Sequence, residues 1–401
     1  MDSLKELYKI GRGPSSSHTM GPERAARDFI RLVPNADGYR VIFYGSLALT
    51  GKGHLSDFAV SSVLGAEKTQ IIFEKQTQQL PHPNTMRICA VDSEGNVVKE
   101  RTYLSVGGGS IRALDEKEER SRSVYPFCSF REIREACERE GLTIDEFVFR
   151  YDDGDIKDYL KRVWRSMQDT IARGLNKTGE LPGDLHILRK AKTLSFSIAG
   201  ESAAAREKRT VCSYAFATAE ENASGGTVVT APTCGASGVL PAVLQYLNKR
   251  LDLSEETVVS ALATAGLVGN VVKRNASVSG AEAGCQAEIG TATAMAAAAA
   301  CRIYGYSLEE TEYAAEIALE HQLGLTCDPV HGYVQIPCIE RNAVAALRAL
   351  DSAELAHVLS GTRKISFDLI VKTMYETGRD LNARYRETSE GGLAETYGKG
   401  C

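Results

Sequence analysis

The chain has 401 residues and a net charge of −5, which at a prior of ~150 residues per domain gives two or three domains. No basic stripe is present, so we expect no nucleic-acid partner. The first residues lack an apolar signal core, and the most apolar stretches fall short of the ~20 residues of a spanning helix. Ten cysteines are too few for a disulfide scaffold of this length. We therefore expect a cytoplasmic protein with reduced thiols and no membrane partner.

A run of hydroxyl side chains precedes the first predicted helix. The run is Gly13-Pro14-Ser15-Ser16-Ser17-His18-Thr19, closed by Gly21-Pro22, and residues 22–32 have a helical pattern. Hydroxyls and free N–H groups at a helix start can form an anion site. The alternative is an ordinary Ser-rich cap, and the residues alone favour neither.

The next hundred residues mix strands with helix. Residues 40–44, 86–91 and 97–106 are predicted strands, and an α+β domain is expected over residues 1–114. Gly107-Gly108-Gly109 is a flexible or close-approach element. The charged run 115–122 is interpreted as a solvated linker.

Beyond the linker the pattern becomes helical. Apolar residues from Ile156 to Ile171 follow helical spacing, and Gly174 is a plausible stop. The Ala- and Gly-rich stretches 258–272 and 291–301 are predicted to be buried helices. The fold class is therefore α+β, a small N-terminal α+β domain followed by a larger, mostly α-helical domain over residues 123–401.

Three cysteines in the last third of the chain have the surroundings of metal ligands. Cys327 is followed two residues later by Pro329, and Cys338 comes directly after Pro337, so the backbone at both thiols is restricted. Cys285 follows Gly280 and Gly284, which leave room for a group to approach. Three thiolates suggest a [4Fe–4S] cluster with one iron open to substrate as a Lewis acid.

Each cysteine taken singly has a simpler explanation, because free Cys is among the most buried residue types. The glycine and proline contexts together favour a cluster over three separate buried thiols. The spacing by itself leaves iron–sulfur and zinc both open. Cys234 is interpreted as a small buried residue and not as a ligand.

Four separated segments, in order, resemble the iron–sulfur-dependent L-serine dehydratases. They are the serine run 13–22, the segment Glu221 to Thr233, the segment Ser279 to Glu288, and the segment Cys327 to Asn342. The resemblance spans nearly the whole chain. One departure is His331 and Tyr333, where smaller or apolar residues are expected, and this departure affects the expected substrate preference but not the cluster.

The resemblance implies deamination of L-serine to pyruvate and ammonia, with a [4Fe–4S] cofactor and the same division into two domains. The serine run would then hold the substrate carboxylate, and the active site would form between the domains. The expected substrate-binding residues are Ser15, Ser16, Ser17, Thr19, Asn84, Asn222 and Thr233. The expected catalytic residues are His18 and His54, and the Cα base is not assigned. A lone His is usually a surface or satisfied core residue, and Asn222 and Thr233 could equally form a connecting turn.

The final residue, Cys401, is hypothesised to be a fourth metal ligand. It carries a soft sulfur and a free carboxylate, and the Gly-rich tail could fold back to place both at the open iron in place of substrate. The family resemblance supports this role. The alternative is a frayed terminus, the usual fate of final residues.

Three other functions compete with the serine lyase. One is a related lyase acting on cysteine or threonine, the second a non-catalytic iron–sulfur redox sensor, and the third a zinc-stabilised binding module. Only an enzyme needs the anion site of the serine run. We also expect a homodimer.

Overall fold

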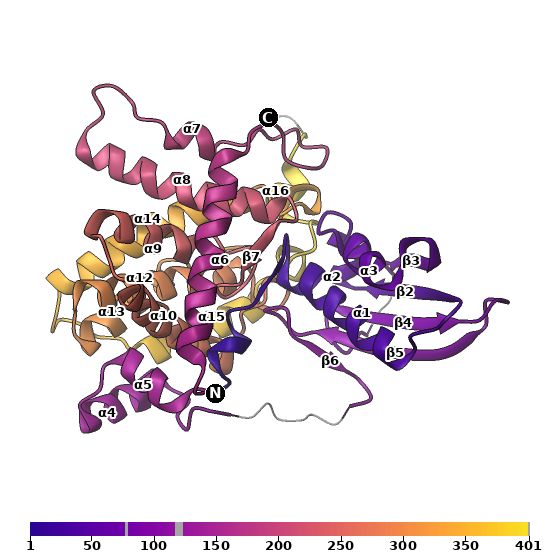
Figure 1. The fold of residues 1–401 in the computed structure, drawn as a ribbon, viewed down its shortest axis with the longest axis horizontal. Coiled ribbons are helices and arrows are strands. Elements are labelled where there is room, and N and C mark those ends of the chain that lie inside the picture. The colour runs from indigo at the N-terminus through magenta and orange to yellow at the C-terminus, as the bar shows by residue number, and fades with distance from the viewer. Residues whose placement is uncertain (77–78, 117–122, 400–401) are drawn as a thin grey trace.

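The computed structural model describes residues 1–76, 79–116 and 123–399. It has the predicted α+β architecture, with a small sheet-containing body beside a larger helical body (Figure 1). Within the part of the chain described, no helix combines the length and apolar character of a membrane span. Each body has its own hydrophobic core.

The small body is a five-stranded sheet in the order β3-β2-β4-β5-β6. The strands β2 and β3 are parallel, and the other neighbours are antiparallel. Alternate residues of β2 are buried, because successive side chains of a strand point to opposite faces. The elements are β2 (Gly38–Tyr44), β3 (Thr69–Glu74), β4 (Thr85–Val91), β5 (Val97–Ser105), β6 (Ile111–Ala113), α1 (Gly21–Leu32), α2 (Ser46–Thr50) and α3 (Ser56–Leu64).

The predicted strands and first helix are confirmed to within two residues at each end. The three glycines 107–109 all have positive φ angles, of 92°, 56° and 75°. A Cβ on Gly107 would lie 3.5 Å from the Cβ of Ser279 in the other body. This turn is therefore a close approach between the two bodies.

The larger body is built of helices around an alanine-rich core. Its elements are α4 (Phe130–Glu140), α5 (Ile144–Tyr151), α6 (Ile156–Asn176), α7 (Ala191–Ser195), α8 (Ala203–Ala223), β7 (Thr227–Val229), α9 (Val239–Leu251), α10 (Glu255–Asn275), α11 (Gly280–Ala283), α12 (Thr291–Tyr304), α13 (Leu308–Glu320), α14 (Cys338–Val358), α15 (Phe367–Asp380) and α16 (Gly392–Thr396). The two predicted buried helices lie within α10 and α12. Small side chains let helices approach closely, which explains why both are buried nearly all round.

The helix predicted to stop at Gly174 ends two residues later, at Asn176. A Cβ at Gly174 would lie 2.2 Å from the carbonyl oxygen of Ala217 in α8. The glycine is therefore a helix-crossing contact and not a stop signal.

The start of the chain belongs to the larger core. Met1, Leu4, Leu7 and Tyr8 are buried there, and β1 (Ile10–Arg12) pairs with β7 in an antiparallel ribbon. The chain then crosses into the small body and returns after residue 116. In the predicted linker, Asp115 and Glu116 pair with Arg101, and residues 117–122 lie outside the described part. The boundaries at 114 and 123 remain predictions.

Candidate functional site

The serine run is buried, unlike an ordinary exposed cap. Residues Ser15 to Thr19 are all at most 5 % exposed. A short π-helical turn, η2 (Ser16–Met20), continues directly into α1. The Ser15 hydroxyl accepts a hydrogen bond from the N–H of His18 at 3.0 Å. The first N–H groups of the helix have no intrahelical acceptor, so the run presents buried donors suited to an anion.

Side chains of the small body hold this run in place. Ser105 donates from Oγ to the carbonyl oxygen of Ser17 at 2.7 Å. Thr19 donates from Oγ1 to the carbonyl oxygen of His54 at 2.7 Å. The run is thus fixed to β5 and to the loop between α2 and α3.

The predicted catalytic histidines meet each other and a carboxylate. The rings of His18 and His54 lie edge to face with centroids 4.5 Å apart. His18 Nδ1 is 3.5 Å from Glu387 Oε1, and all three side chains are buried. Ser46 Oγ lies 3.1 Å from His18 Nε2 and donates to the carbonyl oxygen of Glu387 at 2.6 Å. This arrangement joins α2, the serine run and the C-terminal segment.

Burial sets the charge of this group. It lowers the pKa of His18 to about 3 and holds the pKa of His54 well below its usual range. It raises the pKa of Glu387, and the nearby charge of Glu288 adds to this effect. Both rings are therefore neutral near pH 7 and able to accept a proton. His54 Nε2 and Glu387 Oε2 have no hydrogen-bond partner.

The same three side chains could also share one metal ion, because their ligand atoms lie within 4.8 Å of one another. Two neutral imidazoles and a carboxylate are a usual donor set for a divalent transition metal. Among the described residues, they are the one group of three that meets this distance.

The three predicted cysteine ligands converge from different elements. Cys285 immediately precedes the turn η4 (Gln286–Gly290), Cys327 lies just before the turn η5 (Val330–Gly332), and Cys338 begins α14. All three are free thiols. Burial raises the pKa of Cys327, and the charges of Glu387, Cys285 and Cys338 contribute to the shift.

As they lie, the three thiols do not form a group that could share a single zinc ion. Zn–S bonds of ~2.3 Å in a tetrahedral site hold sulfurs about 4 Å apart, but no described group containing all three thiols lies within 4.8 Å. A Cβ on Gly280 would lie 3.0 Å from Cys327 Sγ. The glycine therefore keeps the space beside this sulfur open.

The thiols and the His–Glu group meet along the C-terminal segment. The N–H of Cys327 donates to the carbonyl oxygen of Tyr385 at 2.7 Å, and the N–H of Glu387 donates to the carbonyl oxygen of Cys327 at 2.8 Å. The candidate site therefore lies between the two bodies.

Three further predicted residues are buried with unpaired polar atoms. Asn84 has no partner at either side-chain polar atom, and Thr233 has none at its hydroxyl. Asn222 donates from Nδ2 to the carbonyl oxygen of Pro14 at 2.8 Å, while its Oδ1 has no partner. His82 lies 3.1 Å from Glu282 across the two bodies. Buried polar groups are normally paired, so these atoms indicate a place for a ligand.

Sequence reasoning missed Glu387, Ser46 and Ser279. The Ser279 hydroxyl is buried without a partner, and its place beside Gly280 in the quoted motif was the available signal. Glu387 and Ser46 lie in no sequence motif that indicates a site. Only the fold brings them beside His18.

The hypothesised ligand Cys401 lies outside the described residues. The tail before it reaches the Cys327 loop, because Asp328 accepts from the N–H of Leu393 at 2.7 Å and Ser389 donates to the carbonyl oxygen of Pro329 at 2.7 Å. His331 pairs with Asp184 at 3.1 Å, and the ring of Tyr333 lies against Gly183. The two residues expected to depart from the family pattern thus contact the loop at 183–184.

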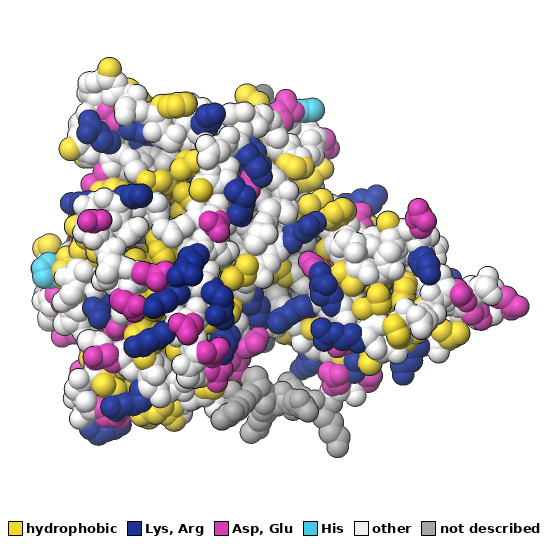
Figure 2. All heavy atoms as spheres, viewed as in Figure 1, with side chains coloured by type: hydrophobic (Ala, Val, Ile, Leu, Met, Phe, Trp, Pro, Cys, Tyr) yellow, Lys and Arg dark blue, Asp and Glu magenta, His cyan; other side chains and the backbone are white. Residues whose placement is uncertain are grey.

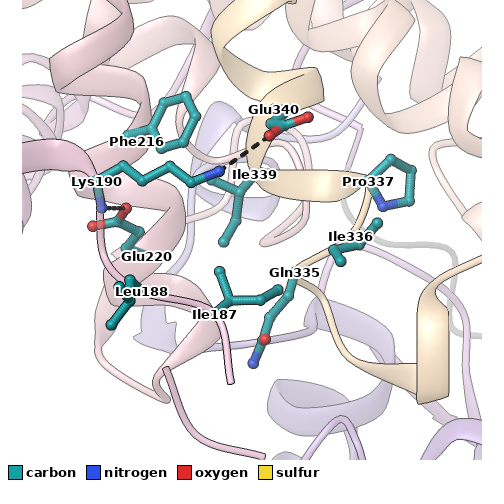
Figure 3. A pocket seen from close by; sticks show the side chains of 10 residues that line it. All are labelled: Ile187, Leu188, Lys190, Phe216, Glu220, Gln335, Ile336, Pro337, Ile339 and Glu340. Carbon is teal, nitrogen blue, oxygen red and sulfur yellow. Dashed lines mark hydrogen bonds and ion pairs between the residues drawn. The ribbon is translucent and has the colours of Figure 1, made fainter. Parts of the chain in front are cut away.

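A separate pocket of about 160 Å³ lies beside the segment that precedes Cys338 (Figure 3). Lys190 faces Glu340 at 3.3 Å, and its N–H donates to Glu220 at 2.6 Å. None of the predicted site residues lines this pocket, and we assign it no part in the candidate site.

Comparison with known proteins agrees with this arrangement. A family model described as serine dehydratase beta chain matches residues 3–67, and one described as serine dehydratase alpha chain matches residues 69–394. The chain therefore belongs to the serine dehydratase family, with both chain types joined in one polypeptide. The border between the matches falls just before β3, within the sheet.

Curated relatives match along their whole length. The chain is 40 % identical to an L-serine dehydratase of Streptomyces coelicolor, over 98 % of each chain. It is 38 % identical to L-serine dehydratase 1 of Escherichia coli, over 98 % of this chain and 99 % of the relative. An L-serine dehydratase of Helicobacter pylori is 38 % identical over 98 % of each chain.

Proposed function

We propose that this protein is an L-serine ammonia-lyase that converts L-serine to pyruvate and ammonia. The observation that carries the proposal is the buried His–Glu group joined through Glu387 to Cys327, with the buried Cys285 and the partly buried Cys338 as the other thiols. The named relatives support the substrate. A redox sensor or a zinc module would need the thiols but not the other groups.

Cys285, Cys327 and Cys338 would hold a [4Fe–4S] cluster, which supplies a Lewis acid for the leaving hydroxyl when bound. Ser15, Ser16, Ser17 and Thr19 would hold the substrate carboxylate at the helix start. The fixed position of this run orients the substrate before reaction.

His54 is the proposed acceptor of the Cα proton. Its Nε2 is buried and unpartnered, and a neutral imidazole can act as a general base. His18 and Glu387 would position it, since His18 contacts both. Asn84, Asn222 and Thr233 would bind the remaining polar groups of the substrate.

Cys401 would be a fourth residue holding the cluster, at the position that serine would otherwise take. The anchoring of residues 389–393 at the Cys327 loop supports this role. The proposed homodimer and cytoplasmic location rest on the family resemblance and the composition.

The deciding experiment is anaerobic purification followed by assays of iron, sulfide and release of the 2-oxo acid, which is pyruvate from L-serine or L-cysteine and 2-oxobutyrate from L-threonine. We expect a brown protein that bleaches in air and releases pyruvate from L-serine faster than from L-cysteine, with L-threonine a poor substrate. Cys327→Ser should lose both colour and activity, while Cys128→Ser, at a half-buried cysteine outside the site, should keep both. A colourless zinc protein, or a brown protein inert toward all three amino acids, would reject the proposal.

A further inference from the structure

A basic cleft lies where α1 meets the N-terminal segment and α6. Its volume is about 410 Å³, within the range of small-molecule sites. Figure 2 shows Lys and Arg side chains, in dark blue, on both sides of this junction. The cationic residues that line the cleft are Lys5, Lys9, Arg12, Arg24 and Arg27.

Two of these cations are already neutralised. Lys5 lies 3.1 Å from Asp153 and 2.5 Å from Asp155. Arg27 pairs with Glu23 at 2.7 Å, and Glu23 is the one carboxylate among the described residues that line the cleft. These paired side chains line the edge of the cleft. The charges of Lys9, Arg12 and Arg24 remain to be accounted for.

Two arginines lack a carboxylate partner in the described parts of the chain. Arg24 donates to the carbonyl oxygen of Gly109 at 3.1 Å. Arg12 lies over the ring of Phe58 at 5.2 Å from its centroid. A guanidinium keeps its charge at all relevant pH values and binds phosphate or carboxylate through paired donors.

Lys9 adds a third, buried charge. It is 9 % exposed, its Nζ lies 2.5 Å from Ser110 Oγ, and Glu6 is 3.2 Å away. Burial lowers the pKa of Lys9 to about 8, although Glu6 opposes the shift, and the charges of Lys273 and Arg24 lower it further. Glu6 therefore balances the charge of the Lys9 ammonium only in part, because Lys273 and Arg24 are also close. A bound anion would supply the missing negative charge.

We propose that this cleft binds a small phosphate ester, with Arg12, Arg24 and Lys9 around the phosphate. A dianion matches the excess of positive charge, and the cleft has room for an organic part beyond the phosphate itself. None of the residues assigned to the serine or cluster sites lines it, so this is a second site.

The position of the cleft links it to both bodies. Arg24 lies on α1 in the small body, whereas Lys9 and Arg12 belong to the segment that packs on the helical body. Met20, which lines the cleft, follows His18 by two residues. A ligand held from both sides would stabilise the two bodies in their present arrangement.

The test is calorimetric titration and thermal denaturation of the full-length protein at constant ionic strength. The probes are glycerol 3-phosphate, inorganic phosphate, citrate and chloride. We expect glycerol 3-phosphate to bind with a Kd below about 1 mM and to raise Tm, with inorganic phosphate weaker and chloride without effect. Neither readout depends on the cluster or on serine turnover.

The variants Arg12→Gln and Arg24→Gln should each weaken binding of glycerol 3-phosphate at least tenfold, with Tm unchanged in its absence. Arg131→Gln, at an exposed side chain on α4, is the matched control and should bind like the parent. Absence of binding, affinity equal to that of the parent in both cleft variants, or tighter binding of citrate than of the phosphate ester would overturn the proposal. If either variant fails to fold, Lys9→Gln provides the same comparison, and affinity equal to that of the parent in Lys9→Gln and in the remaining arginine variant would also overturn the proposal.

Discussion

Several residues of the candidate site carry buried polar atoms without a partner. Such an atom costs about 1–3 kcal/mol, and a bound ligand is one way in which it is satisfied. His54, Asn84, Thr233 and Glu387 each contribute such an atom. They come from four separate parts of the chain.

The free Nε2 of His54 leads to the first prediction. His54→Gln should lower kcat for L-serine about 100-fold or more, because the amide cannot accept the Cα proton, while iron content and absorbance stay unchanged. Exchange of the Cα proton with deuterated solvent should fall in parallel. His357→Gln, at a half-exposed histidine paired with Glu310, is the control. Loss of iron in proportion to activity would assign His54 a structural role instead.

At the scale of elements, the contact between α6 and α8 shows what helical spacing can predict and what it cannot. Helical spacing correctly located α6, but the interpretation of Gly174 used only local propensity. In the fold, this glycine lets α6 approach α8 at Ala217. A contact between elements distant in sequence thus outweighed a local signal.

Gly174→Ala tests this packing argument. Helix propensity alone would favour alanine by about 1 kcal/mol, but the added methyl would overlap the backbone of α8. We expect a net loss of about 1–3 kcal/mol in the free energy of unfolding, measured by urea denaturation. Gly154→Ala, where a Cβ meets no described atom within 4 Å, should change stability little. A stabilised Gly174→Ala protein would contradict the close-contact interpretation.

Helix α13 buries a carboxylate whose cost depends on pH. Glu316 is 1 % exposed, and burial together with Glu320 raises its pKa to about 8. Its folded pKa exceeds the unfolded value, so the folded state binds the extra proton between about pH 4.5 and 8. Stability therefore falls as pH rises through this range.

Glu316→Gln should remove that pH-dependent loss. We expect the variant to be more stable by about 1–3 kcal/mol at pH 8 and equal to the parent near pH 4.5, as measured by thermal denaturation across this range. The exposed Glu376→Gln serves as a control. A gain of the same size at both pH values would show that ionisation of Glu316 is not the cause.

At the scale of the whole molecule, the sequence predicted the α+β class and the main strands and helices, whereas the shared role of Cys285, Cys327 and Cys338 stays a prediction. Each of these leaves a local trace in periodicity or in Pro and Gly neighbours. Glu387 could not be predicted, because its position beside Cys327 depends on the C-terminal segment returning to the site. The placement of the first nine residues was also missed, since an amphipathic start carries no sign of which body it joins.

That placement gives the last prediction, on the independence of the helical body. Met1, Leu4, Leu7 and Tyr8 are buried in its core, and the terminal ammonium donates to the carbonyl oxygen of Tyr125 at 2.9 Å. Burial of four such side chains contributes roughly 6–12 kcal/mol as an upper estimate, comparable to the whole stability of a domain. A fragment of residues 123–401 should therefore lack a cooperative thermal transition by circular dichroism.

Joining residues 1–12 to it through a flexible linker should restore the transition but not serine turnover, because His18 and His54 remain absent. A fragment 123–401 that melts cooperatively within a few degrees of the full chain would show that the N-terminal segment is dispensable to the core, and full activity of either fragment would place the reaction outside the interface between the two bodies.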